Sequence, residues 1–230
     1  MQEIPLINLL IMLLPVAIVI WVLVKWSLDA KNAVYALSRM LGQLLIVGYL
    51  LSYIFNSDSM SLVLLILAMM VFISSWIALG TVKDQRLKLY KKAIFSIALG
   101  GGTIFIVVTQ GVLSLEKWHS PAITIPLAGM IFANCMNSVS LAAERFTIEL
   151  QRGSKYISAR TDALNAALIP VINSLFAVGL VSLPGMMTGQ ILSGVSPLIA
   201  VRYQIMVMAM IFAANGISTI VFIALLKPKQ

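Results

Sequence analysis

Uncharged polar side chains gather in one strongly apolar stretch of the sequence. Asn134, Asn137 and Ser138 are spaced so that they share one face of a helix, by the i, i+3 and i+4 rule. Amides and hydroxyls in such surroundings need hydrogen-bond partners, so this face must meet other helices or a water-filled cavity. Two interpretations stay open. The residues either hold helices together, at about 0.6 kcal/mol per hydrogen bond, or line a pathway.

A second polar group surrounds an expected break in a helix. Pro184 and Gly185 together interrupt helical hydrogen bonding and free backbone carbonyl groups. Thioether sulfur is a soft ligand, so Met186 and Met187 are candidate metal ligands, although methionine also packs well in apolar cores. The candidate pathway residues of this second group are Asn173, Met186, Met187, Thr188 and Gln190.

No set of catalytic residues can be assembled from the sequence. The run Gly100–Thr103 lacks the lysine of a nucleotide-binding loop, and we expect its glycines to permit close helix contact or a local break. His119 is the only histidine, and Cys135 is the only cysteine. A zinc cluster is therefore not available, and because His119 is expected outside the membrane, a Ser–His pair of an intramembrane protease is not available either. We expect no enzyme activity, no catalytic residue and no cofactor bound by this chain.

The composition places the chain among membrane proteins. Of 230 residues, 60% are hydrophobic and 10% are charged, whereas ordinary soluble domains are about 25% charged. A membrane-crossing helix needs about 20 mostly apolar residues. The sequence therefore predicts an all-α, polytopic transmembrane bundle of about seven spans in a single transmembrane domain, residues 1–230. The spans are Ile4–Val24, Ala36–Phe55, Ser61–Thr81, Ala93–Leu113, Ile123–Ala143, Asn165–Leu183 and Ile199–Leu226.

The basic residues orient these spans. Fourteen of the sixteen lysines and arginines fall in alternate connections or in the C-terminal tail, and only Lys117 and Arg202 fall on the other side. By the positive-inside rule, the N-terminus lies outside and the C-terminus lies in the cytoplasm. The net charge of +8 is thus an orientation signal, and we expect no nucleic-acid partner. The expected location is the inner (plasma) membrane, with the lipid bilayer as surroundings.

Several stretches resemble one family of transport proteins. Residues 129–142 resemble the fifth-helix signature of the FetB-type family of small ABC-transporter permeases. The run GLVSLPGMMTGQ at residues 179–190 is similar to the most distinctive block of that family, and residues 197–205 continue it. Members include bacterial permeases implicated in iron export and plant permeases implicated in aluminium tolerance. The matching blocks cover about residues 129–205.

The resemblance implies a permease subunit of an ATP-driven transporter that exports iron or a related metal species. It also implies a permease homodimer and a separate cytoplasmic ABC ATPase, which would bind the ATP. The natural coupling segment is the inner stretch 144–164, with Lys83–Lys92 as a secondary contact. The candidate coupling residues are Glu144, Arg145, Glu149, Arg152 and Tyr156. The alternative is a stand-alone channel or ion-gradient-driven carrier for a small solute, although such carriers commonly rely on an intramembrane acid.

Overall fold

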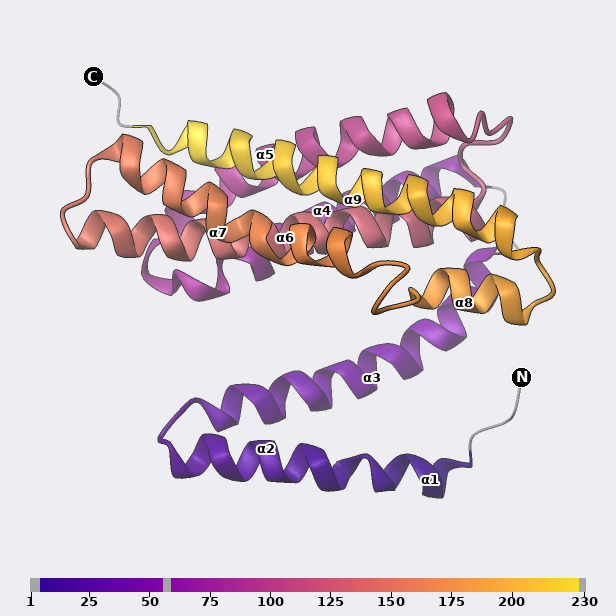
Figure 1. Ribbon diagram of the computed structural model, residues 1–230, viewed down its shortest axis with the longest axis horizontal. Coiled ribbons are helices and arrows are strands. Elements are labelled where there is room, and N and C mark those ends of the chain that lie inside the picture. Colours follow the sequence, from indigo (N-terminus) through magenta and orange to yellow (C-terminus); the bar gives the residue numbers. More distant parts are fainter. Residues whose placement is uncertain (1–4, 56–58, 228–230) are drawn as a thin grey trace. The chain divides into compact units, whose positions relative to one another are not determined.

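The computed structural model describes residues 5–55 and 59–227, and helices make up nearly all of this part of the chain (Figure 1). Its only β feature, within those residues, is an isolated bridge between Val178 and Ser182. The all-α prediction is therefore confirmed. The chain divides into two compact units, residues 1–57 and 58–230.

The first unit is a hairpin of apolar helices. It contains α1 (Leu6–Ile11), α2 (Leu13–Lys25) and α3 (Ala30–Phe55). The first two run on as one candidate span from Ile7 to Lys25. Asp29 caps α3, because its Oδ1 accepts the Asn32 N–H at 3.0 Å. The first two predicted spans thus correspond to helices, although Ile4 lies outside the described residues.

The second unit holds the remaining elements, and α6 lies at its centre. Helix α6 packs against α4, α5, α7 and α9, and α5 also packs along α9. The helices are α4 (Met60–Ala78), α5 (Arg86–Ile106), α6 (Pro121–Gln151), α7 (Tyr156–Ala177), α8 (Gly185–Leu192) and α9 (Pro197–Leu225). Short 3-10 turns η1 (Leu79–Thr81) and η2 (Lys83–Gln85) join α4 to α5, and a π-helical segment η3 (Val107–Val112) extends α5.

Glycines allow α5 to approach its neighbours closely. A Cβ added at Gly100 would lie 2.5 Å from the backbone nitrogen of Ser218 on α9, and one at Gly101 would lie 2.8 Å from the Phe132 ring on α6. Gly102 faces open space. The expectation of close helix contact at these glycines is therefore confirmed for two of the three.

Three helices end in the same hydrogen-bonded turn. After α6, Gly153 has a φ of +83°, its N–H donates to Leu150, and the next N–H, of Ser154, donates to Glu149. This is the Schellman pattern, in which a left-handed residue satisfies the last helical carbonyls. Ser27 ends α2 and Gly194 ends α8 in the same way.

Six of the described helical stretches are long and apolar enough to cross a membrane. They are Ile7–Lys25, Ala30–Phe55, Met60–Thr81, Lys83–Val112, Pro121–Gln151 and Pro197–Leu225. The sixth predicted span, Asn165–Leu183, differs from the structure, because α7 begins at Tyr156 and ends at Ala177. Residues 165–177 of α7 rise only about 20 Å, which is less than the roughly 30 Å of bilayer hydrocarbon. The short helix α8 follows after a non-helical connection.

The inner stretch 144–164 is also more helical than its polar composition suggests. Helix α6 continues to Gln151 and α7 starts at Tyr156, so the two helices meet in a turn of four residues, Arg152–Lys155. Figure 1 shows this turn at the end of the bundle opposite α8. The connection between α4 and α5 and the end of α9 lie at the same end as the turn, since Gln85, Gln151 and Leu226 line or border one shallow cavity.

Candidate substrate site and coupling hairpin

The connection between α7 and α8 breaks the helical path. The carbonyl of Ala177 accepts hydrogen bonds from the N–H groups of Leu180, Val181 and Ser182, at 2.8–3.2 Å. Gly179 makes this turn possible with a φ of +84°. Pro184 then precedes α8 as its N-cap residue, and no side chain caps that helix end. The predicted break at Pro184 and Gly185 thus begins six residues earlier, at Val178.

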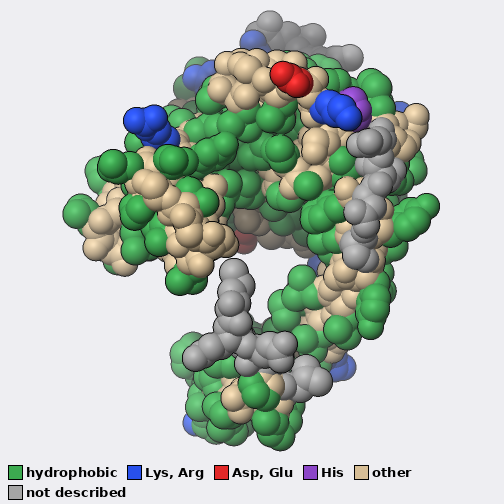
Figure 2. Space-filling view, turned by 90° about the vertical axis from the view of Figure 1, so that its right-hand side faces the viewer, with side chains coloured by type: hydrophobic (Ala, Val, Ile, Leu, Met, Phe, Trp, Pro, Cys, Tyr) green, Lys and Arg blue, Asp and Glu red, His purple; other side chains and the backbone are tan. Residues whose placement is uncertain are grey.

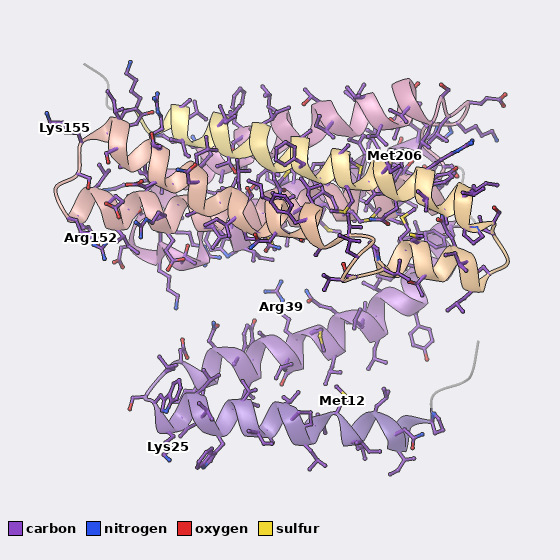
Figure 3. All side chains as sticks on the ribbon, in the orientation of Figure 1. Met12, Lys25, Arg39, Arg152, Lys155 and Met206 are labelled. Atoms are coloured by element: carbon purple, nitrogen blue, oxygen red, sulfur yellow. The ribbon has the colours of Figure 1, made fainter. Side chains whose placement is uncertain are left out.

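A cavity of about 520 Å³ lies where α8 meets the first turns of α6 and α9. We call it the methionine pocket, because Met130 of α6, Met186 of α8 and Met206 of α9 all line it. Figure 3 labels Met206 on α9 in this part of the bundle. The full lining is Leu113, Leu115, Ala122, Ile123, Pro126, Leu127, Met130, Met186, Gln190, Tyr203 and Met206.

Gln190 gives the methionine pocket its main polar feature. It stands four residues after Met186, so both side chains lie on one face of α8. Its Oε1 atom is buried and has no hydrogen-bond partner among the described residues. Tyr203 adds a phenol ring to the same lining. The site therefore offers three thioethers, one unpaired amide oxygen and one phenol.

A second cavity, of about 440 Å³, lies beside the α7–α8 connection. Met187 lines it together with Gln204, a residue that is only 5% exposed. The Oε1 atom of Gln204 also lacks a hydrogen-bond partner within the described part of the chain. Met186 and Met187, proposed together as tentative metal ligands, therefore line different cavities.

The predicted polar face of α6 does not line one cavity. Asn134 donates from Nδ2 to the carbonyl of Met130, at 2.8 Å, and Asn137 is exposed. Ser138 is buried, donates to the Asn215 carbonyl at 3.3 Å, and lies 2.6 Å from the hydroxyl oxygen of Thr219. For Ser138, these bonds between α6 and α9 are those expected of a residue that joins helices.

The other two candidate pathway residues also lie outside the methionine pocket. Asn173 is exposed near the end of α7. Thr188 is half-buried and donates to the carbonyl of Pro184, the N-cap residue of its own helix, at 3.2 Å. Of the eight candidate pathway residues, the methionine pocket brings together Met186 and Gln190. A pathway role for the others stays a prediction.

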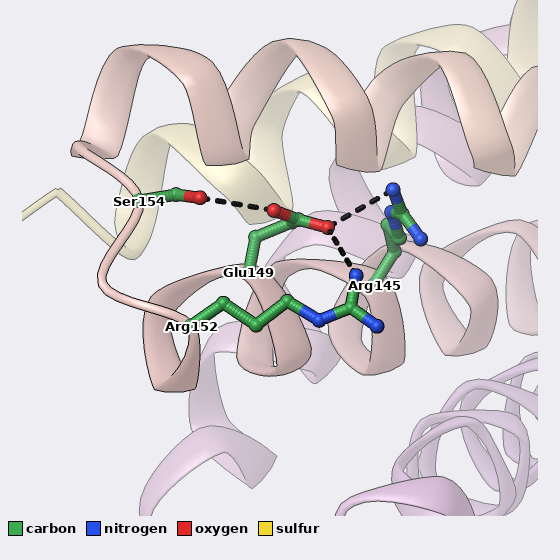
Figure 4. Close-up of polar contacts among 4 residues, drawn as sticks. All are labelled: Arg145, Glu149, Arg152 and Ser154. Carbon is green, nitrogen blue, oxygen red and sulfur yellow. Dashed lines mark hydrogen bonds and ion pairs between the residues drawn. The ribbon is translucent and has the colours of Figure 1, made fainter.

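Glu149 organises the turn between α6 and α7 (Figure 4). The Glu149 side chain is 9% exposed, and its Oε1 pairs with Arg145 at 2.9 Å and with Arg152 at 3.3 Å. Its Oε2 accepts a hydrogen bond from the Ser154 hydroxyl at 2.9 Å. We call residues 145–157 the coupling hairpin. Three of the five candidate coupling residues thus form one ion-pair network at its tip.

The coupling hairpin is fastened to α9. Tyr156 donates from its hydroxyl to the carbonyl of Ile223, at 3.1 Å, and its ring packs edge-on against Phe146 at 5.8 Å between centroids. Alanines of α7 and Ile223 complete a small buried cluster there. Glu144 lies apart from this network and lines a shallow polar cavity with Lys83 and Asp84. The two predicted inner segments therefore meet.

Sequence reasoning did not select Met130, Tyr203 and Met206 as site residues. Helical spacing could have grouped part of the site, since Met186 and Gln190 are four residues apart and Tyr203 and Met206 are three apart. The contribution of α6 depends on tertiary packing, which no spacing rule gives. Among the described residues, no group of three His, Cys, Asp or Glu side chains could hold a metal ion.

The six long apolar helical stretches define a multi-pass helical membrane protein. The chain belongs to the uncharacterised protein family UPF0014, whose profile matches residues 6–229. The resemblance found from the motifs is confirmed.

Three relatives illustrate the family. The chain is 37% identical to the "Probable iron export permease protein FetB" of Escherichia coli K12, over 93% of this chain and 86% of that protein. It is 37% identical to the "UPF0014 membrane protein slr1647" of Synechocystis, over 87% and 89% of the two chains. It is 31% identical to the "Protein ALUMINUM SENSITIVE 3" of Arabidopsis thaliana, over 81% and 72%. No solved structure matches the chain.

Proposed function

We propose that this protein is the permease subunit of an ATP-driven transporter that moves iron or a related metal species. A separate cytoplasmic ABC ATPase would supply the energy, with two permease chains in the assembly. The iron assignment draws on the name of the Escherichia coli relative. The structural observation that supports coupling is the continuity of α9, which contacts the hairpin at one end and the methionine pocket at the other.

This continuity gives a physical route for transmitting motion. Helix α9 has 29 residues and is about 44 Å long at 1.5 Å per residue. Ile223 receives the Tyr156 hydrogen bond near its C-terminal end, while Tyr203 and Met206 line the pocket near its N-terminal end. A displacement of the hairpin would therefore shift the α9 wall of the pocket against α6 and α8. Such repacking is what alternating access requires.

The proposal is tested by iron transport in inside-out membrane vesicles that contain this chain and a candidate ABC ATPase from the same organism. We expect ATP-dependent accumulation of radioactive iron that needs both proteins. A Walker-lysine variant of the ATPase is the control and should abolish accumulation. Uptake by the chain alone under a proton or sodium gradient, with no response to ATP, would instead establish the carrier alternative.

A further inference from the structure

We propose that the methionine pocket binds its cargo as an uncharged metal complex, wrapped by an organic ligand that carries a hydroxyl or amide hydrogen-bond donor. The metal in this inference rests on the proposed function. The neutral charge, the organic ligand and its hydrogen-bond donor are inferred from the lining and volume of the pocket itself.

The first argument is size. The pocket volume of about 520 Å³ lies within the roughly 300–1,000 Å³ that small-molecule sites occupy. A water molecule takes up about 30 Å³ in the liquid, so the pocket has room for a molecule of many heavy atoms. A bare metal ion would leave most of that space to be filled by water against an apolar lining.

The second argument is charge. No lysine, arginine, aspartate or glutamate is among the described residues that line the pocket. Moving an ion from water into such surroundings is costly unless an opposite charge is provided. Hard cations prefer carboxylate and other oxygen ligands, and the pocket supplies no carboxylate. A complex whose own ligands neutralise the metal avoids this cost.

The third argument is the unpaired oxygen of Gln190. This buried atom accepts no hydrogen bond among the described residues, although it lines the pocket. Buried polar groups are nearly always paired in proteins, so a donor supplied by the cargo would complete the site. The three methionines line the same cavity with flexible, polarisable side chains, which adapt to irregular apolar shapes.

Two neutral iron complexes test the inference. Iron(III) tris(kojate) and iron(III) tris(maltolate) share the same pyrone chelate, but only kojate carries a hydroxymethyl O–H donor. Equilibrium dialysis against the full chain in lipid nanodiscs measures both. We expect both complexes to bind, with kojate about fivefold tighter, as one added neutral hydrogen bond would give. Gln190→Leu should remove the kojate advantage and retain maltolate binding.

Gln204→Leu is the matched control, because it removes an equally unpaired buried amide oxygen from the neighbouring cavity. It should leave both affinities unchanged. If thermal melting shows that the leucine variant at 190 is unfolded, Gln190→Met keeps the unbranched side chain and takes its place. The inference is overturned if neither complex binds, if Gln204→Leu rather than Gln190→Leu removes the preference, or if the chain binds ferrous or silver ions and excludes both complexes.

The experiment separates this inference from the proposed function. Dialysis needs no ATPase, so complex binding without ATP-driven transport would leave the pocket assignment standing and remove the transport proposal. ATP-driven iron transport without complex binding at Gln190 would leave the transport proposal standing and remove the pocket assignment.

Discussion

At the scale of single residues, the bundle depends on positions where a side chain would not fit. Gly100 lets the α5 backbone approach Ser218 so closely that an added Cβ would collide with backbone atoms, which cannot rotate away as a side chain can. The sequence indicated that the glycine run permits close contact, yet it could not show that Gly102 faces open space. That distinction depends on the rotation of α5 about its axis, which no local signal determines.

Gly100→Ala should destabilise the second unit by about 1–3 kcal/mol, the usual cost of overpacking a tight contact. Gly102→Ala serves as the matched control, and it should be neutral or slightly stabilising because alanine favours the helix. Thermal melting of the two purified variants in detergent measures the difference. Equal melting temperatures would show that α5 and α9 are less closely packed than described.

At the scale of elements, the sequence predicted the apolar helix cores better than the helix ends. The polar residues after Ala143 stay helical because Glu149 pairs with Arg145 one turn earlier and Gly153 ends α6 in a Schellman turn. The end of α7 was missed for the opposite reason, since Val178–Leu183 are mostly apolar and carry no charge. The one local signal there is Gly179, which adopts a positive φ.

The coupling hairpin should depend on the Glu149 carboxylate. Glu149→Gln weakens two ion pairs whose arginine partners are 42% and 64% exposed, so we expect a local loss of about 1 kcal/mol. Amide hydrogen exchange at residues 149–157 should then be about fivefold faster, because local opening becomes more frequent. Glu144, an exposed carboxylate five residues earlier in α6, is the control, and Glu144→Gln should leave this exchange unchanged. If amide hydrogen exchange is equal in both variants, Glu149 does not organise the turn between α6 and α7.

At the scale of the whole molecule, the described surfaces are those of a protein surrounded by lipid. Many large hydrophobic side chains along the described helices are exposed, Leu45, Leu65 and Phe176 among them. Figure 2 looks onto the end of the molecule where α8 lies, and hydrophobic side chains take up more of the visible surface there than charged ones. Within the second unit, the connections rich in basic residues gather at the hairpin end, as the charge pattern predicted. Which end faces the cytoplasm is still a prediction from the positive-inside rule.

Single-cysteine labelling measures that orientation in intact cells. The native Cys135 is fully buried, so it should contribute little background. A membrane-impermeant maleimide should label Lys117→Cys from outside, and it should label Lys155→Cys only after the membrane is permeabilised. The reverse pattern would show that the orientation is inverted.

The permease account is tested most directly by asking whether an ABC ATPase co-purifies with this chain and whether the chain stimulates its ATP hydrolysis. Arg152 and Lys155 stand at the turn of the coupling hairpin (Figure 3). Arg152→Glu combined with Lys155→Glu should abolish co-purification and stimulation of hydrolysis, while Lys117→Glu, a charge reversal in the connection before α6, should retain both. An ATPase that binds and is stimulated equally by all three proteins would contradict the coupling role of the hairpin, and the absence of any ATPase partner would contradict the central claim.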